Sequence, residues 1–136
     1  MRIGKLGKPT VTKILIMKIN REEVYNKCSG HCAYCGVEIT IKQMQIDHKE
    51  PLFRNHTDKQ LEWYKRDRGT NEMDNLLPSC ARCNRWKSTF TVETFRDIVQ
   101  TSLERLERDT PNFRLAKDYG LLTISEKKVI FYFEKN

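Results

Sequence analysis

The sequence predicts a small α+β domain that is held together by a four-cysteine zinc site and ends in a long helix and a β-hairpin. Three observations lead to this prediction. Two CxxC pairs offer four thiolates, Cys32 with Cys35 and Cys80 with Cys83. Short segments of strand character alternate with polar segments, and apolar residues recur at helical spacing between residues 92 and 109. A length of 136 residues is typical of one compact domain with a modest core.

The charge of the chain favours a polyanionic partner. Lys and Arg number 25 against 18 for Asp and Glu, which gives a formal charge of +7. Nucleic acid is the first candidate, although a basic chain can also be merely soluble, so the motifs must decide. The longest apolar run near the N-terminus, residues 14–17, is too short for a signal peptide or a membrane span, and we expect a cytoplasmic protein that contacts no membrane. In a reducing compartment, five cysteines favour metal ligation over disulfides.

The first 90 residues are expected to divide into an extension and a core. Residues 1–19 form a basic N-terminal extension, whose stretch 11–19 has strand character, and residues 20–90 form the core with the zinc site. Asn20 can cap a short helix over "REEVYNK", which Gly30 ends. Strands are expected in "VEITI" and in "MQIDH", with Pro51 stopping the second.

The second half is predicted to be mainly helical. Thr57 or Asp58 can cap a helix in "TDKQLEWYKRD", and Pro78 with Ser79 can open a helix over "PSCARCNRWKST". Residues 91–136 are expected to pack on the core within a single domain. Thr91 can cap a long helix that runs to Asp109, with an apolar face made by Val92, Phe95, Ile98, Val99, Leu103 and Leu106. The segments "LLTI" and "KKVIFYF" predict a C-terminal β-hairpin.

Four cysteines in two CxxC pairs suit tetrahedral coordination of zinc. Such a site has no open position, so this zinc is expected to be structural and unable to activate water. Cys28 and His31 lie nearby but find no vacancy, and Cys28 is expected to be a small, partly buried residue. The alternative is a set of buried, reduced cysteines without metal.

Between the two cysteine pairs, Asp47 and His48 are adjacent. An imidazole with a pKa near neutrality can accept a proton, and a carboxylate can hold a divalent cation. The alternative is an ordinary Asp-His pair at a strand end, which would have the same sequence. On a regular strand the two side chains would point to opposite faces, so they can serve one site only if the strand twists or ends there.

The surrounding motifs favour the chemical interpretation. The segments "CAYCG", "IDHKEP", "DNLLPSC" and "ARCNRWK", in this order, resemble the zinc-containing branch of the HNH endonucleases, which have the ββα-metal fold. The resemblance covers residues 27–88 and, more weakly, the helix after Thr91. It departs from the family name at Asn84, where histidine is implied, although asparagine also occurs there in the family.

The resemblance implies a role for each matched residue. His48 would be the general base, Asp47 and Asn84 the ligands of a catalytic Mg²⁺ or Mn²⁺, and Asn75 a residue that fixes a loop. Oxygen ligands suit these hard cations. Helical spacing places Asn84 and Lys87 on one face of their helix and the two cysteines on another. The cationic residues expected to contact the nucleic-acid backbone are Arg82, Arg85 and Lys87.

The predicted function is therefore metal-dependent hydrolysis of DNA, with double-stranded DNA as the expected partner. One site cuts one strand per event, so the sequence leaves monomer and dimer open. A non-catalytic, zinc-containing nucleic-acid-binding module and a protein acting on RNA are the alternatives. Three aromatic residues could stack on bases, but aromatics near a small core are more often packing residues, and packing is expected for Trp63, Tyr64 and Trp86.

Overall fold

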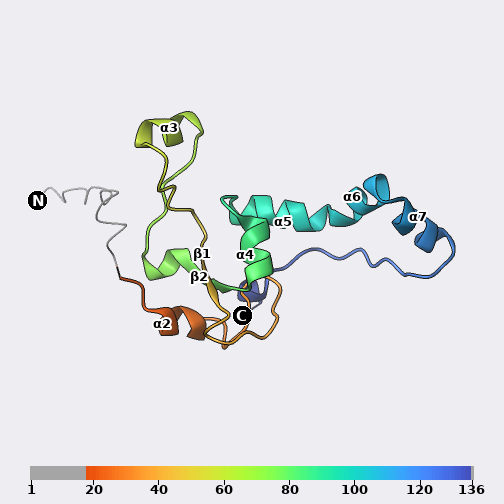
Figure 1. Cartoon of the computed structure of the whole chain (residues 1–136), viewed down its shortest axis with the longest axis horizontal. Coiled ribbons are helices and arrows are strands. Elements are labelled where there is room, and N and C mark those ends of the chain that lie inside the picture. Colours follow the sequence, from red (N-terminus) through yellow and green to blue (C-terminus); the bar gives the residue numbers. More distant parts are fainter. Residues whose placement is uncertain (1–17, 136) are drawn as a thin grey trace, which may run out of the picture.

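The computed structural model describes residues 18–135. The predicted basic extension and its strand-like stretch lie almost wholly outside the described residues. Two short strands, β1 (Gln45–His48) and β2 (Leu76–Ser79), lie between the helices (Figure 1). The helices are α2 (Arg21–Asn26), α3 (Asp58–Trp63), η1 (Met73–Asn75), α4 (Ala81–Lys87), α5 (Val92–Gln100), α6 (Ser102–Asp109), α7 (Pro111–Asp118) and η2 (Tyr132–Glu134). None of these helices, within residues 18–135, is long and apolar enough to cross a membrane.

The two strands form an antiparallel pair in which Asp47 lies opposite Leu77 and His48 opposite Leu76. β1 ends at His48, so the strand stops where the sequence required it to stop. Every residue of β2 is buried. The predicted strand over residues 37–41 is wrong, because this segment makes only an isolated bridge between His31 and Glu38.

Three predicted helix starts are confirmed by their caps. The Asn20 side chain accepts a hydrogen bond from the Glu23 backbone at the start of α2. Thr57 forms a capping box with Gln60 at α3. Thr91 caps α5. By contrast, α4 starts at Ala81, three residues after Pro78 where the predicted helix begins, because Pro78 and Ser79 belong to β2.

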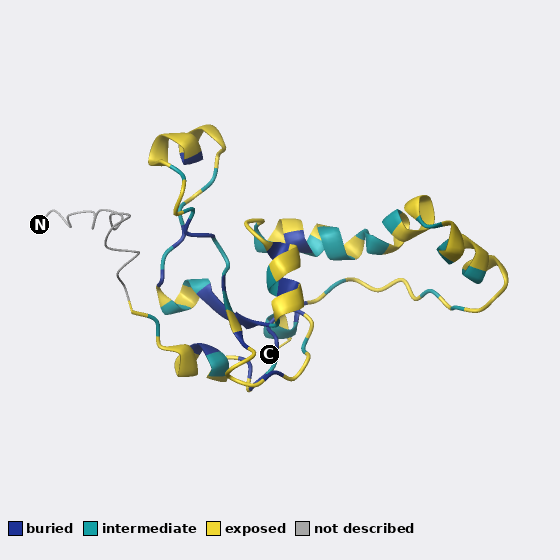
Figure 2. Ribbon diagram, viewed as in Figure 1, coloured by how far each residue is buried: buried dark blue, intermediate teal, exposed yellow. Residues whose placement is uncertain are grey.

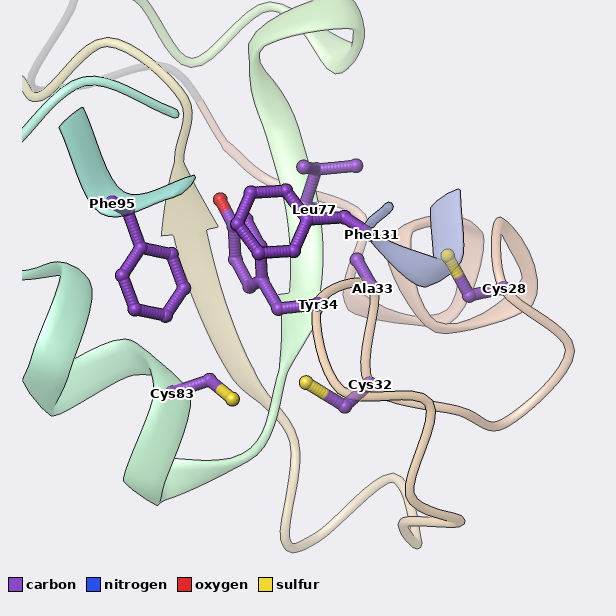
Figure 3. Close-up of a cluster of buried hydrophobic side chains, with 8 residues drawn as sticks. All are labelled: Cys28, Cys32, Ala33, Tyr34, Leu77, Cys83, Phe95 and Phe131. Atoms are coloured by element: carbon purple, nitrogen blue, oxygen red, sulfur yellow. The ribbon is translucent and has the colours of Figure 1, made fainter. Parts of the chain in front are cut away.

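The main core lies between the strands, the first cysteine pair and the C-terminal segment (Figure 2). Tyr34 meets Phe95 and Phe131 edge-on, with ring centroids 5.2 and 5.0 Å away, and the two phenylalanines stack at 5.3 Å. Leu77 of β2 packs on the same cluster, and the sulfurs of Cys32 and Cys83 face each other at its edge (Figure 3). A second cluster joins α2 to β2 through Val24, Ile39, Met44 and Leu76.

The prediction of one long C-terminal helix is wrong. The helix is interrupted at Thr101, whose hydroxyl donates to the Asp97 carbonyl at 2.7 Å, and α6 begins at the next residue. A polar side chain that bonds the preceding turn in this way bends or ends a helix. Pro111 does not lie in a loop after the helix but occupies the first turn of α7, where its missing N–H costs nothing.

The predicted C-terminal β-hairpin is also wrong. The tail returns along α5 without a strand partner among the described residues, and the Gln100 side chain holds it through the Lys127 carbonyl and the Val129 amide. The tail then inserts Phe131 into the main core, where the side chain is 3% exposed. Backbone amides of Tyr132 and Phe133 donate to the carbonyls of residues 34 and 33. The C-terminal segment therefore completes the core by side-chain burial.

Candidate active site

Four sulfur atoms converge at one end of the core. The Sγ atoms of Cys32, Cys35, Cys80 and Cys83 all lie within 4.8 Å of one another, and those of Cys35 and Cys80 are 3.9 Å apart. Zn–S bonds of about 2.3 Å in a tetrahedron place sulfurs about 3.8 Å apart, so the cluster fits a zinc ion after small adjustments. Gly36, at φ +77°, turns the chain after the first pair so that its amide bonds the Cys32 carbonyl.

The protonation of the cluster also suits a cation. A hydrogen bond from Cys83 lowers the pKa of Cys32 to about 4, and the same bond raises the pKa of Cys83. The Cys32 sulfur therefore holds negative charge at neutral pH, which a divalent ion would balance. Cys28 lies outside this set and is buried, as predicted, with burial raising the pKa of its thiol.

The predicted catalytic residues meet in one cavity of about 350 Å³. Asp47 and His48 reach it from the end of β1 and Asn84 reaches it from α4, while residues 51–56 form another wall. Asp47, His48 and Asn84 are thus brought together although 36 positions separate the last two in the sequence (84 − 48).

Asn75 does not line this cavity but ties together the loops beside it. Its amide nitrogen donates to the carbonyls of Glu50 and Thr70, at 2.9 and 2.8 Å, and its amide oxygen accepts from the Glu50 backbone at 2.9 Å. The chain passes close by at Gly69, where a Cβ atom would lie 1.6 Å from the Glu50 carbonyl oxygen. These are the contacts of a residue that fixes the loop after β1.

The His48 ring is oriented by Asn71, which the sequence analysis did not single out. The His48 Nε2 atom lies 2.7 Å from the Asn71 Oδ1 atom. Since the amide oxygen only accepts, Nε2 carries the proton in this arrangement and Nδ1 is left as the acceptor. Burial lowers the pKa of His48, so the ring is neutral at pH 7. One asparagine in a polar loop gives no sequence signal that would have revealed this contact.

Asp47 lies in a buried network of two partners. Its Oδ1 atom is 3.2 Å from the Lys87 Nζ atom, and its Oδ2 atom accepts a hydrogen bond from the Tyr34 hydroxyl. Lys87 also donates to the His48 carbonyl at 2.9 Å. Burial raises the pKa of Asp47, whereas the Lys87 ammonium opposes that shift.

The oxygens present in the cavity fit a hard divalent cation. A carboxylate offers about four acceptor sites, and the Tyr34 and Lys87 bonds occupy two of those of Asp47. Asn84, whose side-chain amide carries one oxygen acceptor, lines the same cavity. An all-oxygen pair of this kind suits Mg²⁺ or Mn²⁺.

The three predicted nucleic-acid contacts occupy different environments. Lys87 is not on the surface: it shares a face with Asn84, as expected, but that face packs on β1 and buries the side chain completely. Arg82 lies on the opposite side of α4, where a hydrogen bond to Cys35 raises its pKa. Arg85 is exposed.

The prediction that three aromatic residues pack in the core is wrong. Trp63 is 76% exposed, Tyr64 53% and Trp86 62%. Trp86 lines a cavity beside Cys35 and Arg82, on the zinc side of α4. Trp63 and Tyr64 lie at the end of α3, on the connection between the two strands.

A protein family and a solved structure are similar to parts of this chain. Residues 32–90 match the family model described as "HNH endonuclease". A similar solved structure is that of the Type II-C Cas9 enzyme from Actinomyces naeslundii, with 24% sequence identity and a TM-score of 0.44, covering 69% of this chain. The match spans 8% of that protein's chain. No curated protein matches this sequence. Over residues 32–90, which include the four cysteines, Asp47, His48 and Asn84, this chain is therefore similar to the HNH endonuclease family.

Proposed function

We propose that this protein is a metal-dependent endonuclease that hydrolyses DNA phosphodiester bonds, with His48 as the general base and a divalent ion held by Asp47 and Asn84. The observation that supports the proposal most directly is the single cavity that these three side chains line. An imidazole and two oxygen ligands in one cavity are what in-line attack on a phosphodiester needs.

His48 would take a proton from the attacking water at Nδ1. Asn71 holds the other ring nitrogen, so the ring keeps one tautomer and one orientation during the transfer. Burial favours the neutral form of the imidazole, which is the form that accepts a proton at pH 7. A positioned general base of this kind contributes about 10²–10⁴-fold to the rate.

Asp47 would present its carboxylate to the metal in a fixed orientation, because Tyr34 and Lys87 hold both of its oxygens. When bound, Mg²⁺ or Mn²⁺ supplies Lewis-acid stabilisation of the charge on the phosphate and on the departing 3′-oxygen. Asn75 maintains the loop that follows β1, and with it the wall formed by residues 51–56.

We assign the four-cysteine cluster a structural zinc ion. It joins the segment before β1 to the start of α4, and so fixes Asn84 relative to the strand that provides Asp47 and His48. The cluster has no open position for substrate, which separates its role from that of the catalytic ion. Within one domain, residues 91–136 would support this core through Phe95 and Phe131.

DNA binding would rest on the basic charge of the chain and on exposed cations such as Arg85 on α4. Because Lys87 is buried, we assign it to the support of Asp47 and no longer to the phosphate backbone. Arg82 lies on the zinc side of α4, so any contact that it makes with DNA would be away from the cavity.

Cleavage of supercoiled plasmid tests the proposal. Zinc-loaded protein should convert the plasmid to relaxed or linear DNA with Mg²⁺ or Mn²⁺, and should leave it intact when neither ion is added. The His48→Ala protein should be slower by about 10²-fold or more. His31→Ala is the control, because it also removes an imidazole but at a residue that does not line the cavity. His31 stacks on Tyr132, with ring centroids 5.2 Å apart, and its replacement should leave cleavage unchanged. Cleavage by His48→Ala at the rate of the unmodified protein would refute the assignment of the base. DNA binding without any cleavage would favour the non-catalytic module.

A further inference from the structure

The connection between β1 and β2 forms a lobe, residues 51–70, that carries α3 away from the two strands and α4 (Figure 1). At its end lie two large aromatic side chains, Trp63 and Tyr64, that are mostly exposed. Exposed aromatic residues next to one another are typical of a surface that binds something.

The lobe is built as a firm support for these two rings. The capping box of Thr57 and Gln60 starts α3, and Leu61 anchors the helix with an exposure of 3%. The Arg68 guanidinium donates to three backbone carbonyls of residues 52, 53 and 56, at 2.7, 2.7 and 2.5 Å. These contacts of the lobe do not involve the Trp63 side chain.

A continuous run of rings joins the tip of the lobe to the candidate active site. Phe53 and His56, whose ring centroids are 5.4 Å apart, line the cavity that contains His48. His56 lies 6.1 Å from Tyr64, and Tyr64 lies 5.0 Å from Trp63. A strand with a phosphate in the cavity would thus pass close to the exposed rings.

The chemistry of this surface selects for bases that are not paired. Within a duplex each base face is covered by its neighbours, whereas an unpaired base can stack on an aromatic ring, and such stacking tolerates any sequence. Lys59 is exposed and lies four residues before Trp63, so the helix presents a cation beside the indole. An aromatic ring next to a cation is the usual combination in sites for single strands.

We propose that Trp63 and Tyr64 form a stacking surface for unpaired bases of a DNA strand, so that the preferred substrate has a single-stranded stretch beside the bond to be cut. This inference rests on the proposed function for its placement at a cleavage site. The binding itself can be measured without cleavage.

Tryptophan fluorescence provides the test, because the chain has two tryptophans. The Trp86→Phe protein reports on Trp63 alone, and the Trp63→Phe protein reports on Trp86 alone. Each is titrated, zinc-loaded and without added Mg²⁺ or Mn²⁺, with oligo(dT) of about 16 nucleotides and with a duplex of equal length. Oligo(dT) should quench Trp63 and leave Trp86 unchanged.

Affinity gives a second measurement. Trp63→Ala should weaken binding of oligo(dT) by about 5- to 150-fold, which corresponds to the loss of stacking on one base, and should weaken duplex binding less. Trp63→Phe keeps a ring and should keep most of the affinity. Trp86→Ala is the matched control and should bind oligo(dT) like the unmodified protein. Since Trp63 is 76% exposed, its replacement is not expected to unfold the domain.

The inference would be overturned by Trp63 emission that saturating oligo(dT) does not change, or by Trp63→Ala protein that binds oligo(dT) as tightly as the unmodified protein. An equal loss of affinity for oligo(dT) and duplex would also overturn it, in favour of a contact with duplex DNA. If the plasmid is cut while Trp63 does not respond, the stacking surface is refuted and the nuclease remains. If Trp63 responds and nothing is cut, stacking is supported and the proposed nuclease activity is refuted.

Discussion

Replacing Lys87 with methionine should destabilise the fold by about 3–5 kcal/mol at neutral pH. The side chains of Lys87 and Asp47 are 0% and 4% exposed, so this ion pair lies fully inside the protein. Methionine fills a similar length without charge, and it leaves a buried carboxylate without its cation. An exposed pair with the same 3.2 Å separation would contribute only about 0–1 kcal/mol.

The pH dependence of this loss can be derived from the same contacts. Burial raises the pKa of Asp47, and the Lys87 charge opposes that rise. Without Lys87 the pKa of Asp47 in the folded protein should rise further, so Asp47 takes up a proton more readily as the pH falls. A protonated Asp47 no longer needs a cation, and the difference in unfolding free energy between the two proteins should therefore shrink towards acid pH.

Urea unfolding of the zinc-loaded protein measures this effect. Asp47→Asn in the Lys87→Met background removes the unpaired charge and should recover a large part of the loss, which a double-mutant cycle expresses as a coupling energy. Arg85→Met, on the exposed side of the same helix, is the control and should change stability by about 0.5 kcal/mol or less. If Lys87→Met lowers the unfolding free energy by less than about 1 kcal/mol, or if the double variant recovers none of the loss, the pair contributes no more than an exposed ion pair does.

Three further predictions follow from the zinc cluster, the His48 contact and the tail. A zinc chelator should lower the thermal midpoint measured by circular dichroism and added zinc should restore it, and Cys28→Ser should still bind zinc; unchanged melting after chelation would exclude a structural metal. Asn71→Asp places a carboxylate beside the His48 Nε2–H and should raise the pKa of His48. The acid limb of the pH–rate profile for cleavage should therefore move to higher pH by about 1 unit. An unmoved limb would contradict His48 as the base. Phe131→Ala should cost about 3–5 kcal/mol in urea unfolding, whereas Tyr119→Ala, at a site that is 76% exposed, should cost almost nothing; equal costs would show that the tail does not complete the core.

The features that could be predicted from the sequence have local causes. The spacing of the four cysteines predicts their cluster, because zinc sites are commonly built from cysteine pairs at short spacing. Asn20, Thr57 and Thr91 mark helix starts because each cap side chain accepts from an amide three residues further on. Such signals need no knowledge of the tertiary structure.

The features that could not be predicted depend on distant partners. β2 contains Pro78, which argues against a strand, yet the Pro78 carbonyl accepts from Ala33 and its position opposite Ile46 is fixed by the register with β1. The burial of Lys87 depends on a carboxylate forty positions earlier in the chain. Asn71 is recognisable only once His48 is placed beside it.

The break at Thr101 shows a different limit. Helical spacing of apolar residues continues from α5 into α6 in the sequence, but the part beyond Thr101 finds no core to cover. Periodicity describes which residues could share a face, and it does not say whether anything packs there. The exposure of Trp63 and Tyr64 has a different cause, because a position near the core in the sequence does not place a side chain inside it.

The arm formed by α6 and α7 has a consequence for how this scaffold can change. Neither helix has a buried residue, and the chain leaves the core at α5 and re-enters it at Phe131 (Figure 2). The lengths and sequences of α6 and α7 can therefore vary without changing the main core. The arm is a place where evolution, or an engineer, can add a binding element without rebuilding the domain.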